Sequence, residues 1–106
     1  MTQIIYQTGE DSFVVKISGH AGYAEKGSDI VCASISSLAQ TLALSIMDST
    51  DKVDYNVEID RDHGMMLISA KGRKALDAFE VVLKGFEQTA FAFPENVSIS
   101  KANGGV

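Results

Sequence analysis

The sequence predicts an α+β fold, a two-layer sandwich in which two helices pack on a mostly antiparallel sheet, with the element order ββαββαβ. Two observations predict it. Short β-forming runs are interrupted twice by longer segments in which apolar residues recur every three or four positions. Each amphipathic helix must cover an apolar face, and a sheet supplies one. The chain has 106 residues, so we expect a single domain over residues 1–106.

The chain begins with two β-forming runs, Ile4–Thr8 and Phe13–Ser18. Residues 9–12, Gly-Glu-Asp-Ser, are typical of turns, and together the two runs predict a β-hairpin. The following residues, Gly19–Ser28, include three glycines and have no hydrophobic period. They predict a loop that is long for so small a domain.

A helix is predicted from Asp29 to about Ser49, where the polar run Asp-Ser-Thr-Asp at residues 48–51 ends it. Apolar residues at helical spacing form one face of this helix: Val31, Ile35, Leu38, Leu42 and Ile46. Serines and threonines lie opposite, so the helix is amphipathic and needs a partner layer.

The second half of the chain repeats the change of period. Residues 53–60 alternate between apolar and polar side chains, which predicts a strand with one solvated face. Residues 61–64 predict a turn, and Met65–Ala70 the partner strand. A second helix ends before Pro94, because proline cannot continue a helix, and Val97–Ser100 is the last strand. The second helix has this apolar stripe: Ala75, Phe79, Val82, Leu83, Phe86, Ala90 and Phe93.

Composition narrows the function classes. No run approaches the roughly 18 continuous apolar residues of a membrane span, and the first residues lack the pattern of a signal peptide. We therefore expect a cytoplasmic protein with no membrane segment. The net charge of −5 disfavours direct nucleic-acid binding. One cysteine and two distant histidines make a poor ligand set, so no metal and no cofactor are expected.

The loop and the first helical turn hold the single cysteine, Cys32, and one of the two histidines, His20. Free N–H groups and the positive end of the helix dipole favour an anion at a helix start, and a thiolate is such an anion. An imidazole within hydrogen-bond reach can take the thiol proton and later protonate a leaving amine. The pattern favours Cys32 as nucleophile and His20 as general base.

Neighbouring residues suggest supporting roles. Asp29 or Ser28 caps the helix, and Asp29 is alternatively a group that orients His20. Ser36 lies one helical turn beyond Cys32, where its hydroxyl can donate to the sulfur, to a substrate carbonyl or to its own helix.

The glycines of the loop, Gly19, Gly22 and Gly27, suit close approach to a bound peptide or movement of the loop as a lid. Residue types alone also allow plainer interpretations. A lone cysteine at the edge of an apolar stripe is more often an inert core residue. His63 is interpreted as part of a turn, and the pair Met65 and Met66 as core.

One segment joins these features at fixed spacing. Residues 19–24 read Gly-His-Ala-Gly-Tyr-Ala, and Gly27, residues 29–33 (Asp-Ile-Val-Cys-Ala) and Ser36 follow. The segment resembles the ribosomal-processing cysteine protease (Prp) family of Firmicutes and related bacteria, and the chain length and element order agree with it. The resemblance assigns the nucleophile to Cys32 and the base to His20. It also assigns supporting positions to Gly19, Asp29 and Ser36.

The resemblance implies a cysteine endopeptidase that is a homodimer and removes a short N-terminal extension from a large-subunit ribosomal protein. Cleavage then follows an aromatic pair that comes after a glutamine. Such a peptide needs an apolar slot, which Tyr23 in the loop can cover, and an acidic protein attracts a basic substrate. Leu44 and Met47, two apolar residues off the main stripe of the first helix, also favour homodimerisation weakly.

Two alternatives from other classes remain. One is a non-catalytic assembly factor that binds a ribosomal protein, and the other is a thiol redox sensor that uses Cys32. Both keep the cysteine at the helix start, but neither needs His20. Replacing His20 by alanine therefore separates them from the protease.

Overall fold

The computed structural model describes residues 1–25, 28–49 and 53–103. The order ββαββαβ is confirmed. Strand boundaries lie close to the predicted ones, and the largest difference is at β1, which begins at Thr2 rather than Ile4. The elements are β1 (Thr2–Thr8), β2 (Ser12–Ser18), α1 (Ile30–Met47), β3 (Asp54–Asp60), β4 (Met65–Lys71), α2 (Arg73–Ala92) and β5 (Val97–Lys101).

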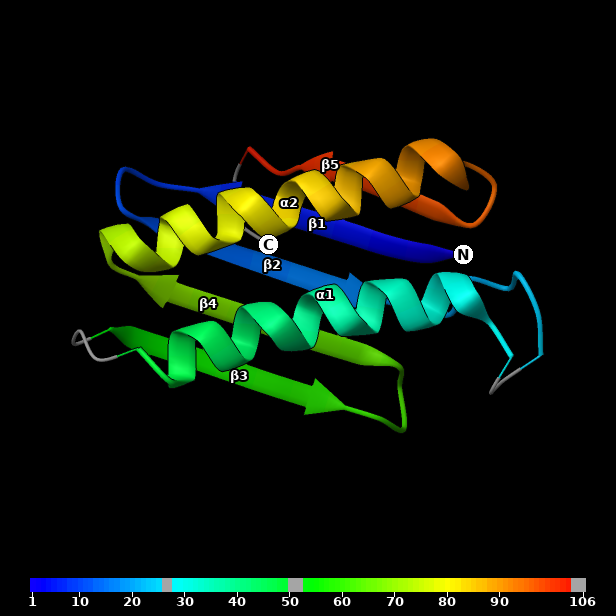
Figure 1. Cartoon of the computed structure of the whole chain (residues 1–106), viewed down its shortest axis with the longest axis horizontal. Helices are drawn as coiled ribbons and strands as arrows, with labels where there is room; N and C mark the ends of the chain where they lie inside the picture. Colours follow the sequence, from blue (N-terminus) through cyan, green and yellow to red (C-terminus); the bar gives the residue numbers. More distant parts are fainter. Residues whose placement is uncertain (26–27, 50–52, 104–106) are drawn as a thin grey trace.

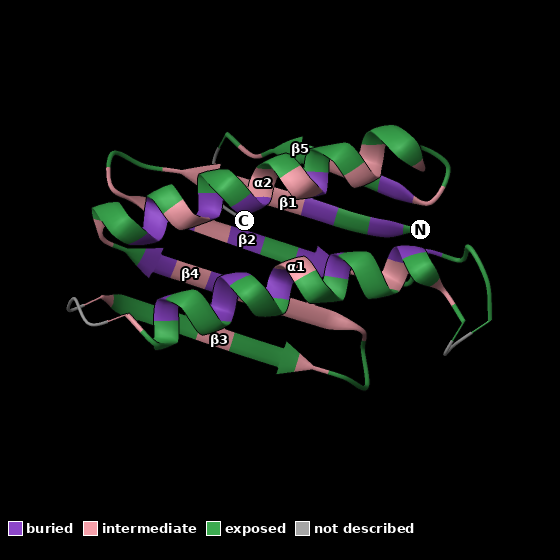
Figure 2. Ribbon diagram, viewed as in Figure 1, coloured by how far each residue is buried: buried purple, intermediate pink, exposed green. Residues whose placement is uncertain are grey.

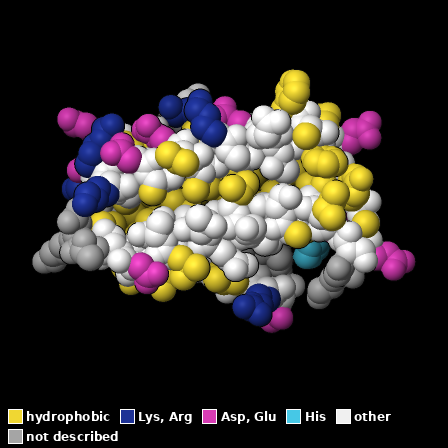
Figure 3. All heavy atoms as spheres, in the orientation of Figure 1, with side chains coloured by type: hydrophobic (Ala, Val, Ile, Leu, Met, Phe, Trp, Pro, Cys, Tyr) yellow, Lys and Arg dark blue, Asp and Glu magenta, His cyan; other side chains and the backbone are white. Residues whose placement is uncertain are grey.

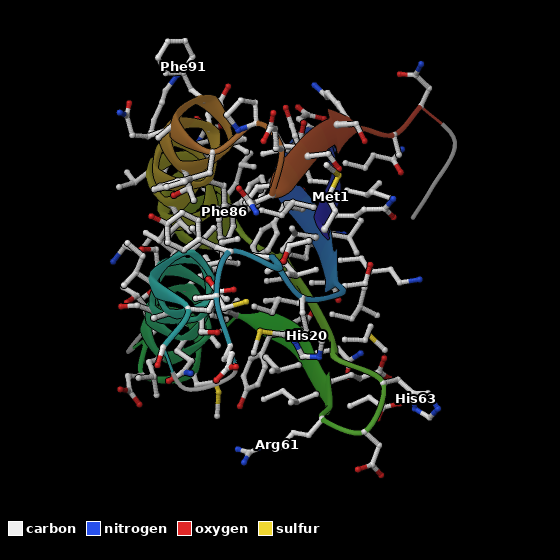
Figure 4. All side chains as sticks on the ribbon, turned by 90° about the vertical axis from the view of Figure 1, so that its right-hand side faces the viewer. Met1, His20, Arg61, His63, Phe86 and Phe91 are labelled. Atoms are coloured by element: carbon white, nitrogen blue, oxygen red, sulfur yellow. The ribbon has the colours of Figure 1, made fainter. Side chains whose placement is uncertain are left out.

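The five strands form one sheet in the order β3-β4-β2-β1-β5. β1 pairs with β5 in parallel, whereas the other three pairs are antiparallel. Both helices cover the same face of the sheet (Figure 1), and the view from the end separates a helix layer from a sheet layer (Figure 4). The predicted two-layer α+β sandwich with a mostly antiparallel sheet is therefore confirmed.

The core lies between these two layers. Ile4, Val15 and Ile68 from the three central strands are fully buried, and so is Phe79 of α2. The ring of Phe79 stacks on Phe13 with the ring centroids 4.5 Å apart. Figure 2 shows the buried positions on the inner faces of both helices and on the central strands. Burial of this apolar area is the main stabilising contribution to the fold.

The two helices approach each other closely at Gly85 of α2. A Cβ atom added to Gly85 would lie 2.7 Å from Cδ2 of Leu38, so a larger residue would push the helices apart. α1 contains no charged residue, and by length and composition alone it is apolar enough to cross a membrane. In this fold its buried face packs into the core, as expected of an apolar core helix. That face comprises Val31, Ile35, Ala39, Leu42, Ala43 and Ile46.

The edge strand β3 is less covered than the rest of the sheet. Its pairing with β4 places Tyr55 opposite Ala70 and Ile59 opposite Met66, on the face that carries the helices. Nevertheless Tyr55 is 49% exposed and Ile59 is 54% exposed. α1 passes above the β3–β4 side of the sheet (Figure 1), but it leaves these two side chains about half exposed.

Candidate active site

The candidate residues lie where several connections meet. The loop after β2, the start of α1, the β3–β4 turn and the α2–β5 turn all lie at the same end of the molecule (Figure 1). Hydrophobic side chains also gather on the surface at this end, where α2 finishes and α1 begins (Figure 3).

Cys32 lies in the first turn of α1, where it is half-buried and carries a free thiol. The backbone N–H of Ala21, in the loop, donates a hydrogen bond to the Cys32 Sγ atom at 3.2 Å. A donor aimed at sulfur stabilises a thiolate more than a neutral thiol. The loop therefore presents an N–H group to this side chain, which lies at the positive end of the α1 dipole.

Asp29 is the N-cap of α1, which settles the choice between Asp29 and Ser28. Its Oδ1 atom accepts hydrogen bonds from the N–H groups of Val31 and Cys32, both at 3.0 Å. Its Oδ2 atom accepts from Tyr23 at 3.0 Å and from Ala24 at 3.4 Å. One carboxylate thus joins the loop to the helix start.

These hydrogen bonds also change the acidity of Asp29. The backbone N–H of Cys32, followed by those of Tyr23 and Ala24, holds the pKa of the Asp29 carboxyl below its ordinary value of 3.8, although desolvation acts in the opposite direction. Asp29 is consequently an anion at neutral pH. Within the described residues its carboxylate makes no hydrogen bond with His20, so the structure gives no support to the alternative in which Asp29 orients the imidazole.

His20 lies between the helix layer and the sheet layer, whereas His63 points away from them (Figure 4). The His20 ring lies against Gly64 of the β3–β4 turn, where an added Cβ would be 3.3 Å from Nε2. The N–H of Gly19 donates to the carbonyl oxygen of Gly64 at 3.0 Å, which holds the start of the loop on that turn. His63 is 80% exposed and bonds Asp60 through Nδ1 at 2.7 Å.

Two cavities meet at Cys32 and His20. The sheet-side cavity, of about 390 Å³, extends between α1 and the β3–β4 hairpin, and the loop-side cavity, of about 480 Å³, lies under the loop. Both are lined by Cys32, His20 and Ser36. No hydrogen bond joins the imidazole to the thiol in the part of the chain that is described, and such bonds often tighten only when substrate binds.

The two cavities differ in character. The sheet-side cavity is largely apolar, with these apolar lining residues: Ile17, Ile35, Ala39, Ile59, Met65 and Met66. Asp60 and Arg61 lie at the same cavity. The loop-side cavity has small residues, Gly22, Ala24 and Ala33, together with Asp29. A chain bound across Cys32 would therefore meet large apolar side chains on one side and a cavity lined by small residues on the other.

The remaining predicted residues are placed as follows. Gly19 is needed for space, because an added Cβ would lie 2.5 Å from the carbonyl oxygen of Met1. Gly22 lines the loop-side cavity. Tyr23 packs edge-on against Phe93, with centroids 5.3 Å apart, and lines neither cavity. Gly27 lies outside the described residues, and movement of the loop as a lid stays a prediction.

Three features of the site were not predicted. Gly64 was interpreted as plain turn chemistry, but it provides the space for the His20 ring. Met65 and Met66 were interpreted as core, but both are half-buried and line the sheet-side cavity. Asn96, from the α2–β5 turn, donates to the carbonyl oxygen of Ala21 at 3.0 Å.

Comparisons with known proteins concern first the fold. The fold is similar to a crystal structure of the essential ribosomal processing protease Prp from S. aureus in complex with a covalently linked product peptide. That match has a TM-score of 0.86 at 20% identity and covers 96% of this chain and all of the other. It is also similar to SMU.848 from Streptococcus mutans, with a TM-score of 0.74 at 27% identity, covering 95% of this chain and 93% of that one.

A search of curated proteins finds no match. The scan against protein families matches residues 1–98 to the family described as cysteine protease Prp. The match spans nearly the whole chain and includes the loop, the first turn of α1 and both cavities. The chain therefore belongs to the cysteine protease Prp family and is a cysteine endopeptidase.

Proposed function

We propose that this protease cuts with Cys32 as nucleophile and His20 as proton acceptor, and that it removes the N-terminal extension of a ribosomal protein. The observation that carries the proposal is the place of the two side chains: Cys32 and His20 line both cavities at the point where these meet. A peptide lying across this point would have its scissile carbonyl beside the sulfur. Family membership favours this function over a redox sensor or a non-catalytic assembly factor.

The chemistry follows from these positions. His20 accepts the Cys32 thiol proton, and the thiolate attacks the scissile carbonyl carbon to form a C–S bond. The protonated His20 then gives its proton to the leaving amine as the C–N bond breaks, which leaves an acyl-enzyme. Water, deprotonated by His20, cleaves the thioester and regenerates the thiol. The N–H group of Ala21 donates to the sulfur, and the positive end of the α1 dipole favours the thiolate as it forms.

The substrate proposal rests on the cavities and on charge. The sheet-side cavity, with Met65 and Met66 in its wall, is large and apolar enough to take an aromatic side chain next to the scissile bond. The net charge of −5 favours encounter with a basic protein, and ribosomal proteins are commonly basic. The S. aureus relative is described as a ribosomal processing protease, which supports the same substrate class here.

We also propose that the protease acts in the cytoplasm as a homodimer with one domain per chain, without direct nucleic-acid binding. Leu44 is 56% exposed and Met47 is 49% exposed on α1, and the half-exposed Tyr55 and Ile59 lie on the neighbouring edge strand. This apolar surface is a candidate contact between two copies. Light scattering at micromolar concentration should give twice the chain mass, and a monomer mass would contradict the dimer.

The experiment that tests the function uses the precursor itself. The protein is incubated with a large-subunit ribosomal protein that carries its N-terminal extension, and the products are read by mass spectrometry. We expect one cut after an aromatic residue and no cut when the extension is already absent. An intact precursor after incubation with protein whose Cys32 is shown to be reduced would overturn the substrate proposal.

A further inference from the structure

We infer that Asn96 is a positioning residue for the nucleophile: through its hydrogen bond to Ala21 it holds the Ala21 N–H group on the Cys32 sulfur. The inference rests on the proposed role of Cys32. It concerns a residue 64 positions beyond Cys32 in the chain, in the turn between α2 and β5, with no chemical role of its own.

The first step is the fixed origin of the Asn96 side chain. The backbone N–H of Asn96 donates to the carbonyl oxygen of Phe93 at 3.0 Å, and the backbone carbonyl oxygen of Asn96 accepts from the N–H of Thr2 at 2.9 Å. Both backbone groups are therefore held between the end of α2 and the start of β1. The side-chain amide leaves this anchored backbone and donates from Nδ2 to the Ala21 carbonyl oxygen at 3.0 Å.

The second step is the place of Ala21. Its side chain is 2% exposed, so the residue is packed into the protein although it lies in a loop. Its carbonyl oxygen accepts from Asn96 while its N–H donates to Cys32 Sγ at 3.2 Å. The N–H and the carbonyl belong to successive peptide units that meet at the Ala21 Cα atom, so a contact that fixes the carbonyl also restricts the backbone rotation that aims the N–H at the sulfur.

The third step is that the other contacts of the loop are made by other residues, so the Ala21 carbonyl oxygen depends on its hydrogen bond from Asn96. Gly19 is bonded to Gly64, and Asp29 accepts from Tyr23 and Ala24. Neither contact reaches the Ala21 carbonyl. Loss of the Asn96 amide would leave this half-buried oxygen without its donor, free the backbone at Ala21 to rotate, and let the N–H move off the sulfur.

The test exploits the single cysteine, since alkylation of the whole protein reports on Cys32 alone. Asn96→Leu removes the donor at similar volume, and Asn96→Ala repeats the test with a smaller side chain in case leucine prevents folding. The pH dependence of the iodoacetamide reaction is measured for each, together with kcat and KM for peptide cleavage. The variants leave unchanged the charged and titratable groups that share the cavities with Cys32, namely His20, Asp29, Asp60 and Arg61.

We expect the alkylation midpoint to rise by roughly half a pH unit to one unit, and kcat to fall by about threefold to tenfold with little change in KM. Thr89→Val is the matched control. It removes a side-chain hydrogen bond to Gly85, at 2.9 Å, within α2, the helix that precedes the turn with Asn96. The control should lower Tm and leave the midpoint unchanged.

If the Asn96 variants lower Tm but leave the midpoint where it is in the wild type, Asn96 is merely structural and the inference is wrong. The alkylation assay needs no substrate, so its outcome is independent of the proposed ribosomal precursor. A shifted midpoint in a protein that cuts no peptide would support the positioning role and contradict only the proposed function.

Discussion

The two helices of this protein begin in different ways. At α1 the Asp29 carboxylate accepts hydrogen bonds from two N–H groups of the helix and two of the loop. At α2 the N-cap is Gly72, which has no side chain to cap with, and its own N–H donates to the carbonyl oxygen of Asp11 at 2.7 Å. The cap of α1 is thus an ionisable side chain, whereas the cap residue of α2 is held through its backbone.

This difference separates a functional helix start from a structural one. The arrangement at α1 joins loop, helix and nucleophile through one carboxylate, so changes there should affect chemistry and stability together. Changes at the start of α2 should affect stability alone. The predictions below test this division.

The largest effect is expected from the two proposed catalytic residues. Cys32→Ser and His20→Ala should each lower kcat/KM by about 10³-fold or more, because a serine hydroxyl is much harder to deprotonate than a thiol and because the proton acceptor is lost. Circular dichroism and Tm should stay close to wild type, since Cys32 is only half-buried and His20 is exposed.

His63→Ala is the control for the histidine. His63 is 80% exposed, and its recorded partner is Asp60. Its loss should leave cleavage within about twofold of wild type, because the His63 side chain lines neither of the two cavities at Cys32. Equal loss of activity in the two histidine variants would contradict the assignment of His20.

A smaller effect is expected from glycines at the two ends of the molecule. Gly64→Ala places a Cβ 3.3 Å from His20 Nε2, at a backbone φ of +59°, so the imidazole must shift. Cleavage should fall by about 10-fold to 100-fold, because a catalytic group displaced by less than 1 Å already reacts slowly.

Gly72→Ala serves as the comparison. Gly72 also has a positive φ, of +141°, but among the described residues an added Cβ would meet only Val53, at an ordinary 3.9 Å. It should lower Tm, since L-residues are strained at that φ, and leave kcat/KM unchanged. Parallel losses of activity in both variants would indicate that general destabilisation, rather than the position of His20, explains the Gly64 result.

Asp29 should make stability depend on pH. Its folded-state pKa lies below the ordinary value of 3.8, so its stabilising effect is complete above that value and is lost as the pH falls through the folded-state pKa. Asp29→Ala should lower Tm at pH 7 by about 4–8 °C, a typical effect for a lost helix cap in a small domain.

The difference in Tm between wild type and Asp29→Ala should therefore shrink below pH 3.8. Asp62→Asn, at an exposed position in the β3–β4 turn, is the control and should change Tm less than Asp29→Ala does at pH 7. A Tm difference that stays constant from pH 7 to pH 2.5 would contradict the proposed role of the ionised cap.

Sequence patterns predicted the elements of this fold well, because each element reflects local periodicity. The alternation in residues 53–60 and the helical spacing from Val31 to Ile46 are visible within one segment of chain. The strand order β3-β4-β2-β1-β5 was not predictable in this way. It depends on pairing between segments far apart, such as the parallel contact of β1 with β5.

The site residues also divide into those that local sequence predicts and those that depend on contacts between distant segments. Cys32, His20 and Asp29 lie within one short segment, and the helix-start argument connects them from sequence. Gly64 and Asn96 come from distant turns and look like ordinary turn residues in the chain. Their contacts with His20 and Ala21 exist only after the sheet has formed, and no single-sequence signal indicates them.

The smallest effect on stability is expected from removing a charged pair on the exposed face of α2. This pair also tests whether the start of α2 contributes to function. Arg73 bonds Asp77 at 3.2 Å in an i,i+4 pair, with side chains 68% and 57% exposed. Arg73→Gln should lower the free energy of unfolding by less than about 0.5 kcal/mol, because exposed pairs are well screened by water. The difference should diminish further at 1 M NaCl.

Lys84→Gln, which removes a weaker exposed pair with Glu87 at 4.0 Å, provides the control in the same helix. Neither variant should change cleavage or the alkylation of Cys32. A loss of activity in Arg73→Gln at unchanged stability would show that the start of α2 contributes to function and that the division between the two helix starts is wrong.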